Sequence, residues 1–135
     1  MTEASETRSV IVEREMPFPP EKIWRALTQP HLIEEWLMKS DFKPVVGQQF
    51  KFSEEWGTIE CQVQAIEPNR ALSYTWAAFG LESVVTWTLT PTSTGTLLRM
   101  EQAGFPMDQQ QAYQGATQAW PEYLAAMEQV LAKAG

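Results

Sequence analysis

Few residues in this sequence have side chains suited to nucleophilic or metal chemistry. His31 is the single histidine and Cys61 the single cysteine. His31 follows Pro30 at an expected helix start, and a lone histidine makes a poor metal site, so we predict no bound metal. Cys61 falls on the inward face of an expected strand with no evident cationic neighbour, so we interpret it as a buried, inert thiol. A histidine-based triad and a glycine-rich phosphate loop are absent from the sequence.

Gln102 is the polar residue that best fits a binding role. It is in phase with Met100, which predicts that its amide points inward near one end of a strand. An inward amide needs hydrogen-bond partners, and either a ligand carbonyl or hydroxyl or the protein's own backbone and water can supply them. Glu54 and Glu55, just ahead of Trp56, end a strand where they would edge the mouth of a pocket.

Large aromatic rings are numerous, with six Trp and six Phe in 135 residues. Strand alternation points Trp76 and Trp87 inward, and helical spacing points Tyr113 and Trp120 toward the sheet. These rings either bound a cavity that holds a flat apolar ligand or fill the core. The residues predicted to contact such a ligand are Trp56, Trp76, Trp87, Met100, Gln102, Tyr113 and Trp120.

The elements that must position these side chains begin with a strand and two short helices. A strand rich in β-branched residues is expected over 9–16. Pro20 suits the first turn of a helix because its missing N–H would have no partner there, and Trp24 lies on that helix's apolar face. Pro30 ends this helix and opens a second short one that carries Trp36.

The segment from Phe42 to Gly104 alternates apolar and polar residues. The clearest runs are 49–53, 59–65, 72–76 and 85–89. In the run 59–65 the odd-numbered residues, the last of which is Ala65, are expected to face inward. Turn residues at 56–57, 68–69, 79–80 and 91–95 separate the strands. Because these connections are short, we expect a curved antiparallel meander with one buried face.

The last segment, 109–133, predicts one long helix. Asp108 is a plausible N-cap, and apolar residues recur from Tyr113 to Leu131 at steps of three or four. This stripe stays in phase across Pro121, so we expect a single kinked helix that packs across the sheet.

Length and charge set the broad class. We expect residues 1–7 to be a disordered leader and 8–135 to form one domain. The formal charge of −7 argues against nucleic acid and against an anionic membrane surface. The sequence has no apolar run long enough to span a bilayer, no secretory signal and one Cys, which together favour the cytoplasm.

Five segments carry a resemblance to a known family. They are PPEKIWRALTQPHLIEEW (19–36), PVVGQQF (44–50), IEPNRALSYTW (66–76), VTWTLTPTSTGTLLRMEQAGF (85–105) and AWPEYLAAMEQVL (119–131). In this order and spacing the sequence resembles the SRPBCC or START-like superfamily, and within it the proteins related to the activator of heat-shock-protein-90 ATPase. The resemblance implies an α+β helix-grip fold, a curved antiparallel sheet with a short helix pair and one long C-terminal helix packed across it.

The resemblance implies less about function, because the superfamily includes lipid carriers, cyclases, receptors and co-chaperones that share a cavity but little chemistry. Relatives often carry His at the place of Gln102, followed closely by Gly-Phe as in Gly104-Phe105. Gln does not titrate near neutrality, which weakens an acid–base mechanism.

Three hypotheses follow. The first is a domain without cofactor that holds a hydrophobic small molecule between sheet and helix. The second is a cyclase or hydrolase acting on an aromatic or polyketide-like substrate, with Gln102, Tyr74 and Glu54 as its polar groups. The third is a protein-interaction domain with a chaperone partner, by family analogy alone, with an apolar surface at 36–38. The sequence leaves open whether the protein forms a homodimer.

Overall fold

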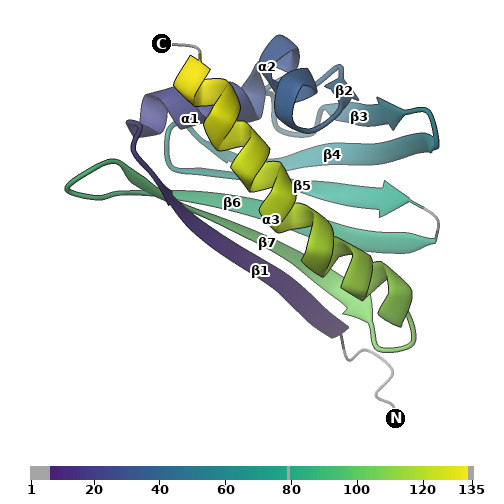
Figure 1. The fold of residues 1–135 in the computed structure, drawn as a ribbon. Helices are drawn as coiled ribbons and strands as arrows, with labels where there is room; N and C mark the ends of the chain where they lie inside the picture. Colours follow the sequence, from purple (N-terminus) through teal and green to yellow (C-terminus); the bar gives the residue numbers. More distant parts are fainter. Residues whose placement is uncertain (1–6, 79, 134–135) are drawn as a thin grey trace.

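The computed structural model describes residues 7–78 and 80–133 (Figure 1). The first six residues of the expected leader lie outside this part of the chain, and Thr7 already belongs to a strand. The helices are α1 (Pro20–Thr28), α2 (Pro30–Trp36) and α3 (Gln110–Lys133). The strands are β1 (Thr7–Met16), β2 (Lys39–Ser40), β3 (Gln49–Glu54), β4 (Gly57–Glu67), β5 (Ala71–Ala78), β6 (Leu81–Pro91) and β7 (Thr96–Pro106).

Within the described residues the strands form one seven-stranded antiparallel sheet in the order β1-β7-β6-β5-β4-β3-β2. Strands β3 to β7 follow one another as hairpin neighbours, as the short turns predict, and β1 closes the far edge by pairing with β7. The α+β helix-grip architecture expected from the sequence is therefore confirmed. The two-residue β2, which pairs with β3, is too short to leave a periodic signal.

Proline sets the starts of the two short helices. Pro20 and Pro30 each occupy the first helical turn, where a missing N–H costs nothing. Gln29 links the two helices, because its N–H bonds to the Arg25 carbonyl and its own carbonyl accepts from the next helix. The indole of Trp36 then donates to the Ala26 carbonyl at 2.8 Å, which fastens α2 onto α1.

The predicted alternation of β4 is wrong beyond Val63. Ala65 is exposed and Ile66 is half-buried against the core, because the register between β4 and β5 shifts between Val63 and Ala65. Such a β-bulge adds one residue to a strand and moves every later side chain to the opposite face.

Helix α3 crosses one face of the sheet diagonally, and α1 and α2 lie beside its C-terminal end (Figure 1). It begins at Gln110, and its first bond runs from the Tyr113 N–H to the Gln109 carbonyl, one residue later than an Asp108 cap implies. The helix continues through Pro121 as predicted. From Trp120 onward the residues on the inner face of the helix are buried, and these include Leu124, Met127 and Leu131.

Candidate functional site

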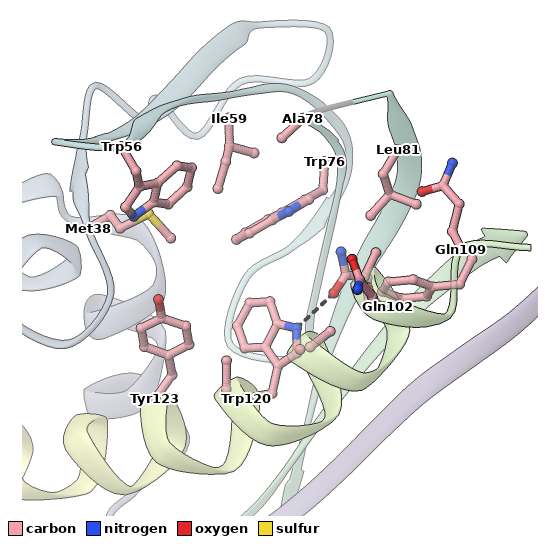
Figure 2. Close-up of a pocket in the computed structure, with 16 residues that line it drawn as sticks. Met38, Trp56, Ile59, Trp76, Ala78, Leu81, Gln102, Gln109, Trp120 and Tyr123 are labelled. Atoms are coloured by element: carbon pink, nitrogen blue, oxygen red, sulfur yellow. Dashed lines mark hydrogen bonds between the residues drawn. The ribbon is translucent and has the colours of Figure 1, made fainter.

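A cavity of about 430 Å³ lies between the sheet and the N-terminal half of α3 (Figure 2). Small-molecule sites in proteins commonly fall between about 300 and 1,000 Å³. The lining residues are Met38, Trp56, Ile59, Trp76, Ala78, Leu81, Gln102, Phe105, Gln109, Gln111, Ala112, Gly115, Ala116, Ala119, Trp120 and Tyr123.

Small side chains on α3 leave this space open. Ala112, Gly115, Ala116 and Ala119 face the sheet side at helical steps of three or four, and all four line the cavity. A methyl group or a hydrogen does not reach the strands beneath. One turn further along, the large ring of Trp120 closes the inner end of the cavity.

The sheet contributes large apolar side chains to the opposite wall. Trp76 on β5 approaches Trp120, with ring centroids 5.3 Å apart at an interplanar angle of 59°. At the mouth, Trp56 in the turn between β3 and β4 is 52% exposed, while Tyr123 packs against Trp120 (Figure 2). The cavity is thus aromatic and buried at its inner end and reaches solvent at this turn.

A bulge in β7 places Phe105 in this wall. The register with β1 shifts between Arg8 and Ser9, opposite Gly104, whose φ of +113° is a conformation that favours glycine. A Cβ at Gly104 would also approach the Glu82 carbonyl oxygen to 3.1 Å. Because of the extra residue, Phe105 faces the same side of the sheet as Gln102, although an odd number of positions separates them.

Gln102 is the polar group of the buried lining, and it is only 2% exposed. Its carbonyl oxygen accepts a hydrogen bond from the Trp120 indole Nε1 at 2.7 Å, drawn dashed in Figure 2. Its amide nitrogen donates to the Ser83 hydroxyl at 3.0 Å, and that hydroxyl donates to the Trp76 carbonyl at 3.0 Å. The amide is therefore held between sheet and helix by two of its own bonds.

The cavity wall is electrically neutral. Among its described residues, Tyr123 is the one with an ionisable side chain. Burial raises the pKa of Tyr123, and the nearby carboxylates of Glu54 and Glu122 raise it further, so its hydroxyl stays protonated at neutral pH. A general acid–base pair of carboxylates or imidazoles is not present in this described lining.

Four of the seven residues predicted to contact a ligand line the cavity: Trp56, Trp76, Gln102 and Trp120. The other three lie outside the lining. Trp87 is fully buried in the core, where its indole donates to the Tyr74 hydroxyl at 3.0 Å, and Met100 is fully buried too. Tyr113 lies toward the β1 edge, with its ring against Phe105 and under the Arg8 guanidinium.

The other residues of the cavity wall were not predicted from the sequence as ligand contacts. Ala116 belongs to the apolar stripe of the helix, but the meaning of small residues at 112, 115, 116 and 119 was missed. Their spacing of three or four in the helix is the signal that could have revealed a gap. Phe105 needed knowledge of the bulge, and Met38 and Tyr123 needed the tertiary fold.

The residues of the other two hypotheses are dispersed. Tyr74 lies in the core, where burial raises its pKa, and Glu54 is not part of the cavity wall. Trp36, Leu37 and Met38 are all buried, so the segment named for a chaperone contact presents no apolar surface. Burial likewise raises the pKa of the Cys61 thiol, which keeps it protonated and unreactive.

The described residues provide neither a metal site nor a membrane-spanning helix. No group of three or more potential ligands in 7–78 and 80–133 is placed to hold a metal ion. None of the helices in this part of the chain combines the length and apolar character needed to cross a membrane.

Known proteins match this chain closely in structure. Protein MLL2253 from Mesorhizobium loti has 58% sequence identity and a TM-score of 0.93, over 95% of this chain and 99% of that one. CalU16 from Micromonospora echinospora has 26% identity and a TM-score of 0.80, over 95% of this chain and 78% of that one.

DynU16, a protein from the dynemicin biosynthetic locus, shares the fold at 22% identity and a TM-score of 0.83. The match covers 91% of this chain and 46% of DynU16, so this chain spans about half of that protein. A comparison with curated proteins finds no match.

The family described as Activator of Hsp90 ATPase homolog 1-like protein matches residues 17–132. This range runs from just before α1 almost to the end of α3, and so includes every residue of the cavity wall. The chain belongs to the Activator of Hsp90 ATPase homolog 1-like family, within the SRPBCC or START-like superfamily.

Proposed function

We propose that this protein binds an apolar, aromatic small molecule in the cavity beneath the N-terminal half of α3. The observation that carries the proposal is the cavity itself, about 430 Å³ of space with tryptophan walls and no charged side chain in its described lining. The cavity reaches solvent at the turn that carries Trp56, so without a ligand its apolar walls face water. A ligand that fills the cavity removes this apolar surface from water, which is favourable.

The expected affinity is modest. A two-ring ligand that buries about 200 Å², as a Trp side chain does, gains roughly 5 kcal/mol from apolar burial. Part of that gain is lost when the ligand gives up its freedom of motion. Ring stacking on Trp76 and Trp120 adds to the gain from apolar burial. A natural ligand with more than two rings would fit the available volume and bind more tightly, because it would bury more apolar surface.

The test is to fill the cavity from the protein side. N-phenyl-1-naphthylamine is a neutral probe whose fluorescence rises in apolar sites, and we expect it to bind the wild-type protein saturably. In Ala116→Leu the new side chain occupies the cavity, so the probe should bind at least tenfold more weakly while thermal stability is retained.

Ala132→Leu is the matched control, because Ala132 is exposed near the other end of α3. It should bind the probe as the wild type does. Absence of saturable binding to the wild type, or equal binding to all three proteins, would contradict the proposal.

A further inference from the structure

The hydrogen bonds around Gln102 have a fixed direction. An indole N–H can only donate and a backbone carbonyl can only accept, so Trp120 at one end and the Trp76 carbonyl at the other orient every group between them. The Gln102 oxygen must face Trp120, and its nitrogen must face the Ser83 hydroxyl. The amide cannot flip without breaking two bonds.

This arrangement leaves Gln102 with one N–H and one carbonyl lone pair beyond the bonds described. The two are not equivalent in energy, because a buried N–H without an acceptor is rarer in protein interiors than a carbonyl oxygen with an unused lone pair. Gln102 lines the cavity and is almost fully buried, so the molecule that occupies the cavity is the natural source of an acceptor.

Charge gives a second restriction. A ligand carboxylate would be buried among Trp, Ala, Leu and Phe side chains with no cation in the described wall to pair with it. At the mouth, Glu54 and Glu122 lie close enough to raise the pKa of Tyr123, so they also oppose an anion. The formal charge of −7 on the whole chain acts in the same direction.

We propose that the ligand class is a neutral, flat aromatic molecule bearing a hydrogen-bond acceptor such as a ketone, and that the free N–H of Gln102 receives that acceptor. Gln102 is then the selectivity residue of the site, and Ser83 is the positioning residue that keeps its nitrogen turned toward the ligand. This inference rests on the proposed binding function and goes further by naming the ligand chemistry.

The experiment compares three molecules of nearly equal shape. 2-Acetylnaphthalene carries the carbonyl, 2-isopropenylnaphthalene replaces its oxygen by CH₂, and 2-naphthoate replaces the ketone by a charged carboxylate. Each competes with N-phenyl-1-naphthylamine at pH 7, and the readout is the ratio of dissociation constants between ligands. This ratio is insensitive to the fraction of protein that is folded.

We expect the wild type to favour the ketone over the alkene by about fivefold, the value of one net hydrogen bond, and to bind the carboxylate at least tenfold more weakly than the ketone. In Gln102→Met, which keeps side-chain length but has no N–H, the preference for the ketone should disappear. Ser83→Ala should reduce that preference partly. Gln118→Met, the same change at an exposed glutamine on α3 that is not part of the cavity wall, should leave the ratio unchanged.

Equal ratios in the wild type and Gln102→Met, with all ligands bound, would overturn this inference and leave the proposed function standing. Tighter binding of the carboxylate than of the ketone would also overturn it. If Gln102→Met does not fold, the wild-type ligand series and Ser83→Ala decide the question. If the probe itself does not bind, the proposed function fails first.

Discussion

The two halves of α3 pack against the sheet in opposite ways. The half from Gln110 to Ala119 presents alanines and a glycine, and a cavity of about 430 Å³ lies beneath it. The half from Trp120 to Lys133 presents Trp, Leu and Met side chains that are buried. One helix thus anchors the fold at one end and roofs the candidate site at the other.

The difference teaches that side-chain size, and not the course of the helix, decides where the domain is open. Both halves follow the same helical spacing and cross the same sheet. Trp120 is the boundary, because its ring contacts both Trp87 in the core and Trp76 in the cavity wall. A domain that used large residues throughout would gain stability and lose its binding space.

The largest effect should come from emptying the packed half. Leu124→Ala removes a fully buried side chain, and we expect the free energy of unfolding to fall by about 2–5 kcal/mol. Urea unfolding followed by Trp fluorescence measures it. Gln111→Ala, an exposed change on the open half, should stay within about 0.5 kcal/mol. A loss below about 1 kcal/mol for Leu124→Ala would show that the C-terminal half is not the anchor.

The boundary residue should affect both stability and binding. Trp120→Phe keeps a ring but removes the N–H that reaches Gln102, which leaves a buried carbonyl without its donor. We expect a loss of about 1–3 kcal/mol in thermal unfolding and weaker binding of N-phenyl-1-naphthylamine. Trp24→Phe is the control and should leave probe binding unchanged, because Trp24 is a half-buried ring on α1 whose indole makes no such bond to a described residue.

The fold was predictable because its signals are periodic. Period two in the strands and steps of three or four in the last helix identify the meander and the helix that covers it. The exceptions are local. The bulge after Val63 carries no proline or glycine, so nothing in the periodicity announces that Ala65 turns outward. The two-residue β2 depends on its neighbour β3 rather than on its own sequence.

The site was predictable only in part. Alternation placed Trp76 and Gln102 correctly, but it cannot tell an inward ring that lines a cavity from one that fills the core, and Trp87 is of the second kind. That distinction depends on the size of the residue across the gap. Opposite Trp76 lie the small residues at 112–119, whereas Trp87 is contacted by the rings of Trp36 and Trp120.

The loss of stability at alkaline pH should differ between the two regions, because each contains a buried or half-buried tyrosine with a raised pKa. Burial raises the pKa of both Tyr74 in the core and Tyr123 at the cavity, so each group binds its proton more tightly when folded. That stability is fully present below the unfolded pKa of 10.0 and is lost as pH rises above it. We expect losses of up to about 1.4 kcal/mol per pH unit from Tyr74.

Urea unfolding at pH 8, 10 and 11 tests this. Tyr74→Phe should flatten the decline above pH 10, although it also removes the acceptor of the Trp87 indole and so lowers stability at every pH. Tyr123→Phe should flatten it less, because water screens the half-buried hydroxyl. An equal change in both variants would mean that the core and the cavity are equally hydrated.

The smallest expected effect comes from Gly115→Ala on the open half of α3. This substitution tests helix propensity while filling little of the cavity. Gly115 lies on α3, and a Cβ added there would meet no atom within 4 Å. Gly115→Ala should therefore stabilise the protein by about 0.5–1 kcal/mol, through the lower backbone entropy of alanine in the unfolded chain. A single methyl group takes little of the cavity, so probe affinity should change less than about twofold.

Gly104→Ala is the opposing control for the same substitution, because its φ of +113° and the nearby Glu82 carbonyl make a side chain unfavourable. Differential scanning calorimetry should show the melting temperature rising for Gly115→Ala and falling for Gly104→Ala. If Gly115→Ala instead lowered stability, the N-terminal half of α3 would be packed against something, and the contrast between the two halves of the helix would not hold.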